Sequence, residues 1–139
     1  MIFEDFITNG KVVVGEKDLQ KAKAVIKMSD NNLKAANMLD MTETTASTIL
    51  SISYESIRQI LEAMCLKEGY KVYSHEAFTA YLKSKNEEQM AEEFDRLRKL
   101  RNGINYYGKQ VSTEVSEDAK KKIKKLCDTL KNKYLSALH

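Results

Sequence analysis

The chain has 139 residues, and its 23 lysines and arginines against 20 aspartates and glutamates leave a net charge of +3. A charge this small does not by itself indicate a nucleic-acid-binding protein. The length suits one domain, residues 1–139, that buries about two-thirds of its unfolded surface in a single core. The chain has no proline and is 42% hydrophobic, which favours long, uninterrupted helices over a loop-rich fold.

The sequence has no signature of a metal, redox or membrane site. Cys65 and Cys127 lie far apart, each within a helical pattern, so we predict two buried thiols and no cofactor. The opening residues MIFEDFITNG lack the basic start and the long apolar core of a signal peptide. No apolar run approaches the roughly 20 residues needed to span a bilayer. We therefore expect a cytoplasmic protein that does not enter the membrane.

The first third of the chain predicts one short helix and one long helix. Residues 2–8 fit a short helix that ends at Gly10. The β-branched run Val12–Val14 follows, but no other segment alternates convincingly, so we expect a packed connector rather than a sheet. From residue 16 to about residue 39, apolar residues recur at helical spacing. We expect one long helix there, and residues 29–32 are the weak patch at which it would kink or break.

The middle of the chain has the clearest helical pattern. Residues 40–44 supply turn and N-cap chemistry. The apolar stripe that follows runs up to Gly69 and consists of Ala46, Ile49, Leu50, Ser53, Ile57, Ile60, Leu61 and Met64. Its flank carries Tyr54, Glu55, Arg58 and Glu62. If this helix is an antiparallel neighbour of the arginine-rich helix described below, Tyr54 and Glu55 face Arg101.

Further helices are predicted in the second half of the chain. Ser74 fits an N-cap, so His75 lies at a helix start, where we expect a structural role in the turn and not a catalytic one. The glutamate-rich stretch EEQMAEEF, residues 87–94, is typical of a helix N-terminus.

A last helix follows a polar segment that offers three possible caps, Ser112, Thr113 and Ser116. Its apolar stripe is Val115, Ala119, Ile123, Leu126, Leu130 and Ala137. It also carries a lysine run, formed by Lys120, Lys121, Lys122, Lys124 and Lys125. A run of this kind is usually a solvated face, and the alternative is an electrostatic footprint for RNA or another polyanion.

The arginine-rich helix covers residues 94–108, FDRLRKLRNGINYYG. At about 100° per residue, one broad stripe is predicted as its core face: Met90, Leu97, Leu100, Ile104, Tyr107 and Val111. Arg101 lies on the flank of that stripe, roughly 60° from its centre, and Asn105 points almost the same way one turn later. Arg98, Asn102 and Tyr106 form a second row that faces further outward.

An arginine at the edge of a core keeps its charge and needs an acceptor. The acceptor can be an internal ion pair, a group on a partner subunit or a bound anion. Gly103 lies within the same helix, where a glycine often marks a close approach to the backbone, by a ligand or by a neighbouring helix. We therefore predict a ligand or RNA site without an assigned catalytic residue, formed by Arg98, Arg101, Asn102, Asn105 and Tyr106.

Two stretches resemble the HEPN family of small all-helical domains. RNGINYYG, residues 101–108, is similar to the family signature, in which an arginine, usually followed by asparagine, precedes a histidine by about four to six residues. SHEAF, residues 74–78, is similar to the Ser or Thr and His that open a helix in many members. The resemblance spans roughly residues 45–111. Asn105, Tyr106 and Tyr107 stand where the family's ribonucleolytic histidine would be, so that histidine is absent.

The long segments and short connections predict an all-α, single-domain, antiparallel bundle of about five main helices. The resemblance implies that this fold is HEPN-like. It also implies a homodimer in which two copies of the Arg101 helix approach across a cleft.

Function is expected from the same resemblance. It implies a binding or regulatory partner of a small nucleotidyltransferase, as in toxin–antitoxin pairs, that holds a nucleotide or RNA near Arg101 without cutting it. The alternatives are a metal-independent ribonuclease and a structural dimeric adaptor. Asparagine cannot perform acid–base work and an ordinary tyrosine titrates far above neutral pH, which favours binding over cleavage.

Overall fold

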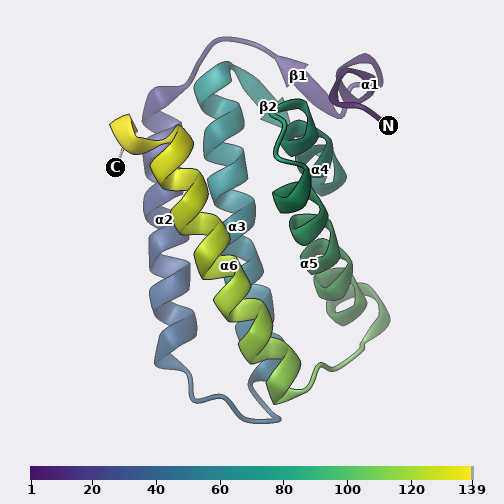
Figure 1. The fold of residues 1–139 in the computed structure, drawn as a ribbon, viewed down its shortest axis with the longest axis vertical. Coiled ribbons are helices and arrows are strands. Elements are labelled where there is room, and N and C mark those ends of the chain that lie inside the picture. The colour runs from purple at the N-terminus through teal and green to yellow at the C-terminus, as the bar shows by residue number, and fades with distance from the viewer. Residues whose placement is uncertain (139) are drawn as a thin grey trace.

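The computed structural model describes residues 1–138, which form six α-helices and one small antiparallel sheet (Figure 1). The helices are α1 (Phe3–Thr8), α2 (Leu19–Met38), α3 (Ala46–Glu68), α4 (His75–Ser84), α5 (Glu88–Tyr107) and α6 (Thr113–Tyr134). The strands are β1 (Val12–Val14) and β2 (Tyr70–Val72), and a 3-10 turn, η1, covers Ser136–Leu138. The predicted all-α bundle is therefore confirmed, with α2 to α6 as its main helices.

Helix α3 is the centre of the bundle. It packs against α2 and α6 on one side and against the α4–α5 pair on the other (Figure 1). The apolar stripe predicted from the sequence is buried along its whole length. Gly69 ends the helix in the left-handed conformation, with φ of 91°. A glycine adopts this conformation without steric cost, so the stop at Gly69 is set by the local sequence.

Helix α2 runs unbroken through the weak patch at residues 29–32. The Ser29 hydroxyl donates to the Ser56 carbonyl oxygen at 2.8 Å, and the Asn32 amide donates to Gln59 Oε1 at 2.9 Å. These polar side chains therefore face α3 and have partners there, which removes the reason for a break. The helix begins at Leu19 because the Asp18 carboxylate accepts a hydrogen bond from the Lys21 backbone N–H, as an N-cap does.

The prediction that Val12–Val14 is only a connector was wrong. It pairs with Tyr70–Val72 in an antiparallel register, with Val12 opposite Val72. The Gly15 N–H donates to the Gly69 carbonyl oxygen at 2.7 Å, which closes this pairing. A Cβ on Gly69 would lie 2.5 Å from the Gly15 carbonyl oxygen, so only glycine fits. The partner strand follows α3, and a three-residue segment so distant gives no local signal of pairing.

Helices α5 and α6 do not pack along each other. Helix α5 packs on α4 and α3, whereas α6 packs on α3 from a different side (Figure 1). Helix α6 begins where Ser112 accepts a hydrogen bond from the Val115 N–H at 3.1 Å, so Ser112 is the cap among the three candidates. Both predicted buried thiols, Cys65 and Cys127, are buried and unpaired. Within residues 1–138, every helix is too short or too polar to cross a bilayer.

Candidate functional site

The buried face of α5 differs from the predicted stripe. Ala91, Phe94 and Leu97 are buried, whereas Leu100 is half-buried and Tyr107 is 76% exposed. Ile104 and Val111, also in the predicted stripe, are only half-buried. The prediction is confirmed in part: Leu97 is buried and Met90, Leu100, Ile104 and Val111 pack partly buried against the core, whereas the inclusion of Tyr107 was wrong. The true core face is turned toward the arginines, so Arg101 extends the core face instead of flanking it.

An aromatic cluster holds this face of α5 against α3 and α4. Phe94, on α5, is fully buried, and its ring stacks on Tyr54 of α3 with 5.7 Å between the centroids. Phe94 also meets Phe78 of α4 edge to face at 6.3 Å. Tyr54 is fully buried as well, although its place on the flank of the α3 stripe did not predict this. The cluster fixes the direction in which the following turns of α5 present their side chains.

Arg101 lies two turns beyond Phe94 and covers Tyr54. Its guanidinium carbon is 5.3 Å from the centroid of the Tyr54 ring, which confirms the expected facing of Tyr54 and Arg101. With the Asn105 amide oxygen turned inward, Arg101 Nε and Nη2 donate to that oxygen at 2.9 and 3.1 Å. No carboxylate within residues 1–138 forms an ion pair with Arg101. Arg101 is half-buried, and its guanidinium keeps a charge that no carboxylate of residues 1–138 compensates.

The neighbouring arginines differ from Arg101 because carboxylates neutralise them. Arg58 on α3 is held between Glu55, at 2.7 Å, and Glu62, at 2.8 Å. Arg98 Nη2 on α5 lies 2.9 Å from Asp95 Oδ1. Glu55 is thus engaged by Arg58 and forms no ion pair with Arg101 within residues 1–138. Arg101 is left as the unneutralised cation of this region.

His75 reaches the same place from the start of α4. The Tyr54 hydroxyl and His75 Nδ1 are 3.0 Å apart. Because the Tyr54 side chain is fully buried and its hydroxyl has no other acceptor in the described chain, the hydroxyl donates to Nδ1. The ring proton of neutral His75 is then on Nε2.

Burial keeps both members of this pair in their neutral forms. It raises the pKa of the Tyr54 hydroxyl well above its ordinary value, so Tyr54 retains its proton. It also lowers the pKa of His75, as do the nearby guanidinium groups of Arg58 and Arg101. His75 is therefore a neutral N–H donor near pH 7, beside the positive charge of Arg101.

The structure brings together only part of the predicted set. Arg101 and Asn105 are joined, and Arg98 lies close enough for its charge to act on Tyr54 and His75. Asn102 and Tyr106 are turned away, since they follow Arg101 by about 100° and 140° of helix rotation, and Tyr106 is 70% exposed. We name the assembled group the Arg101 cluster; it consists of Tyr54, His75, Arg101 and Asn105.

His75 is the member that sequence reasoning placed outside the site. The signal was the SHEAF stretch, which indicated a helix start but not what its histidine contacts. Gly103 was expected to mark a close neighbour, yet a Cβ there would meet only side-chain carbons of Lys109, at 3.5 and 4.0 Å. A neighbouring helix therefore does not explain Gly103.

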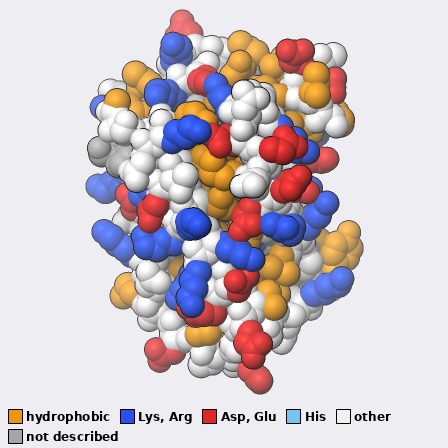
Figure 2. Space-filling view, in the orientation of Figure 1, with side chains coloured by type: hydrophobic (Ala, Val, Ile, Leu, Met, Phe, Trp, Pro, Cys, Tyr) orange, Lys and Arg blue, Asp and Glu red, His pale blue; other side chains and the backbone are white. Residues whose placement is uncertain are grey.

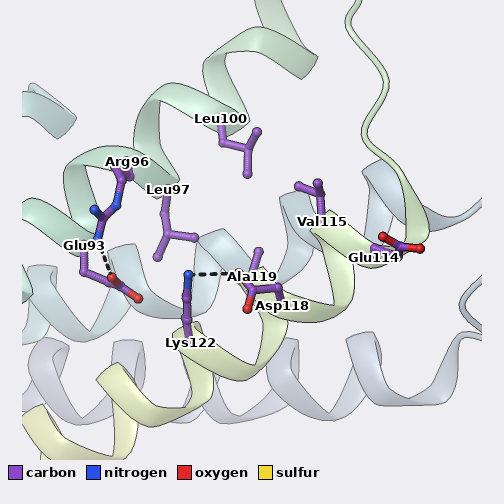
Figure 3. Close-up of a pocket in the computed structure, with 9 residues that line it drawn as sticks. All are labelled: Glu93, Arg96, Leu97, Leu100, Glu114, Val115, Asp118, Ala119 and Lys122. Carbon is purple, nitrogen blue, oxygen red and sulfur yellow. Dashed lines mark hydrogen bonds and ion pairs between the residues drawn. The ribbon is translucent and has the colours of Figure 1, made fainter.

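A separate groove lies between α5 and α6. One part of it is a cavity of about 320 Å³, into which Leu97, Leu100, Val115 and Ala119 point (Figure 3). A wider cavity of about 630 Å³ continues it toward the start of α5. In the space-filling view, hydrophobic side chains lie between charged ones on the face of the molecule that is shown (Figure 2). None of the predicted site residues lines this groove, which we call the α5–α6 groove.

Two ion pairs on the rims of the α5–α6 groove lie within single helices. Glu93 and Arg96 of α5 lie 2.7 Å apart, and Asp118 and Lys122 of α6 lie 2.9 Å apart (Figure 3). Residues 1–138 contain no group of three or more His, Cys, Asp or Glu side chains that could hold a metal ion. The uncompensated charge of Arg101 therefore makes the Arg101 cluster the stronger candidate for a functional site.

No family model matches the chain, and no match was found among curated proteins or solved structures. The HEPN resemblance of residues 74–78 and 101–108 stays a prediction.

Proposed function

We propose that the protein is a HEPN-like binding or regulatory protein that holds the phosphate of a nucleotide or of RNA at Arg101. The observation that carries this proposal is the half-buried Arg101 guanidinium, which has no carboxylate partner in the described chain and covers the buried Tyr54 ring. In the HEPN-like interpretation, its partner is a small nucleotidyltransferase of the toxin–antitoxin type.

The geometry of Arg101 suits a phosphate. A guanidinium carries five N–H donors, and Asn105 engages only the edge formed by Nε and Nη2. The other edge, formed by Nη1 and Nη2, keeps the fork that can bind two phosphate oxygens at once. Tyr54 and Asn105 hold the group in place before a ligand arrives, which reduces the entropy lost on binding.

The protonation of His75 supports binding over cleavage. A general base must have a free ring nitrogen that can accept a proton. In neutral His75, Nδ1 accepts from the Tyr54 hydroxyl, and Nε2 already carries the proton. Tyr54 itself is a poor acid–base group because burial raises the pKa of its hydroxyl. The ribonuclease alternative would therefore need a base from elsewhere.

The proposed homodimer would use the exposed end of α5. Tyr106 and Tyr107 are 70% and 76% exposed, and aromatic side chains are enriched at protein interfaces. We expect a dimer at micromolar concentration in sedimentation experiments. Tyr106→Asp should weaken it, because an unpaired charge would be buried at the contact. If the wild type stays monomeric at high concentration, the homodimer is excluded, and the structural adaptor alternative is excluded with it.

The main test compares two arginines on the same helix. Arg101→Ala and Arg96→Ala would be assayed for binding of AMP and of a fluorescein-labelled single-stranded RNA. Arg96 is the matched control because its side chain is 71% exposed and pairs with Glu93 on another side of α5. We expect about a tenfold or larger loss of affinity for Arg101→Ala and little change for Arg96→Ala. Circular dichroism would check that both variants fold.

Two further measurements sharpen the result. Arg101→Lys should restore affinity only in part, because an ammonium lacks the planar fork. Added salt should weaken wild-type binding. The proposal fails if the wild type binds neither AMP nor the RNA, or if the two alanine variants bind equally well. RNA cleavage that survives a chelator and disappears in Arg101→Ala would establish the ribonuclease alternative instead.

A further inference from the structure

We infer that His75 and Tyr54 complete the phosphate site at Arg101. His75 donates its Nε2–H to the phosphate that Arg101 binds, and Tyr54 is the positioning residue for both donors. The site consequently selects a terminal phosphomonoester, a dianion, over a phosphodiester, a monoanion. This inference rests on the proposed function, because it assigns the ligand class of the same site.

Arg101 and His75 share the ring of Tyr54 as a contact. Arg101 has its guanidinium carbon 5.3 Å from the Tyr54 centroid, and the His75 ring centroid is 5.8 Å from it. The two donors come from different helices, α5 and α4, and both contact one fully buried side chain of α3. Phe94 stacks on that side chain and restricts its movement. Both donors are therefore held against the same ring before any ligand binds.

The hydrogen bond between Tyr54 and His75 decides what His75 can offer. Since Nδ1 accepts from the Tyr54 hydroxyl, the available ring atom is Nε2, with its hydrogen. A neutral imidazole held this way is a donor, as an anion site requires. If His75 becomes protonated, Nδ1 also carries a hydrogen, and the Tyr54 hydroxyl must turn to accept from it, which leaves the hydroxyl hydrogen without an acceptor in residues 1–138. The pair therefore remains hydrogen-bonded in both charge states.

The charges that face His75 come from two helices. From α3 they are Glu55 and Arg58, which form an ion pair, and Arg58 also pairs with Glu62. From α5 they are Arg98, which shares the Asp95 carboxylate with Lys99, and Arg101, which pairs with no carboxylate in residues 1–138. The net field at His75 is positive when the site is empty, and it opposes a second cation.

A bound phosphate would reverse this field in proportion to its charge. A monoanion compensates the charge of Arg101 alone, whereas a dianion adds a second negative charge that can stabilise an imidazolium. A phosphomonoester would therefore lead His75 to take up a proton from the buffer. The ion pair between the dianion and the imidazolium raises the affinity for a monoester. A diester does not form this pair.

The experiment uses AMP and 3′,5′-cyclic AMP, which share the base and ribose but carry a phosphomonoester and a phosphodiester. Calorimetry near pH 7, in two buffers with different ionisation enthalpies, would give both the affinity and the number of protons taken up. For the wild type we expect AMP to bind at least several-fold more tightly and to be accompanied by greater proton uptake.

Two substitutions of His75 separate its donor from its charge. His75→Gln keeps an N–H donor near the position of Nε2 but cannot be protonated, so the histidine's part of the proton uptake should disappear. His75→Ala should lose that uptake and also bind AMP more weakly than His75→Gln. Tyr54→Phe keeps the ring below Arg101 but cannot donate to Nδ1. We expect it to weaken AMP binding and to shift the pH profile of that binding.

The outcomes distinguish this inference from the proposed function. If Arg101→Ala loses AMP while the His75 and Tyr54 variants match the wild type in affinity and proton uptake, the inference fails and the proposed function stands. A His75→Ala protein with a lower melting temperature but unchanged AMP affinity would likewise reduce His75 to a structural role. Equal wild-type affinity for AMP and cyclic AMP would overturn the assigned ligand class. If the wild type binds neither compound nor the labelled RNA, both proposals fall together.

Discussion

Helix α5 has two apolar sides with different surroundings. The side toward α3 and α4 carries Ala91 and Phe94, which the neighbouring helices cover completely. The side toward α6 carries Leu100 and borders the α5–α6 groove, which no element of residues 1–138 fills. Both sides look alike in the sequence, because hydrophobic periodicity counts apolar side chains and not their neighbours.

The charges on the two sides also differ. Along the groove, Glu93 and Arg96 pair within α5, and Glu114 adds a further negative charge to the rim, which disfavours an anion. On the covered side, Arg101 contacts an aromatic ring and an amide but no carboxylate. An apolar groove is therefore a weaker indication of phosphate binding than one rigidly held, uncompensated guanidinium.

The largest expected effect tests whether the two apolar sides differ in energy. Phe94→Ala should lower the free energy of unfolding by about 3–5 kcal/mol, because it leaves a cavity between Tyr54 and Phe78. Leu100→Ala, on the groove side, should cost only about 1 kcal/mol, since Leu100 is already half-exposed. Urea unfolding of both variants measures the difference. Similar losses would mean that the groove is filled in solution, for example by a second copy of the chain.

A smaller effect concerns a third side of α5, where Gly103 lies. Gly103→Ala should raise the free energy of unfolding by about 0.5–1 kcal/mol, because alanine favours the helix and a Cβ meets only Lys109 carbons. AMP binding should be unchanged, since Gly103 is about 200° around the helix from Arg101.

Gly108→Ala is the matched control for this substitution. Gly108 caps α5 with φ of 64°, and a Cβ built there would meet no atom within 4 Å. Gly108→Ala should therefore lower the free energy of unfolding by about 1 kcal/mol, through backbone strain alone. Thermal unfolding would compare the two. Weaker AMP binding by Gly103→Ala would show that the ligand contacts the backbone of this third side.

The smallest effect is a dependence of stability on pH, carried by His75. Burial lowers the folded-state pKa of His75, so between that value and the unfolded pKa of about 6.5 the unfolded chain binds more protons. The contribution of His75 to stability is therefore fully present above this window and is lost as pH falls through it. The wild type should lose more stability than His75→Gln between pH 7 and pH 5, as measured by urea unfolding.

An equal loss in both proteins would contradict the neutral, buried assignment of His75. The comparison is internally controlled, because the chain has only two histidines and His139 is present in both proteins. Most carboxylates titrate below this range, so their contribution to the difference is small.

The ends of the helices were determined by the sequence itself. Asp18 caps α2, Gly69 ends α3 and Ser112 caps α6, each through a hydrogen bond or a backbone conformation that involves residues within one turn. The stripe of α3 was equally predictable, because a helix buried on nearly all sides keeps its period whichever neighbours cover it. The all-α class followed from these local signals.

Only the tertiary structure decided which side of α5 is the core, which strand pairs with Val12–Val14, and what His75 contacts. Each depends on segments that are distant in the chain: Phe94 meets Tyr54, Val12 meets Val72, and the Tyr54 hydroxyl meets His75. Local periodicity contains no information about such partners, because the same apolar or polar pattern is compatible with several neighbours. The Arg101 cluster therefore exists as a site only because three helices place its side chains around one buried ring.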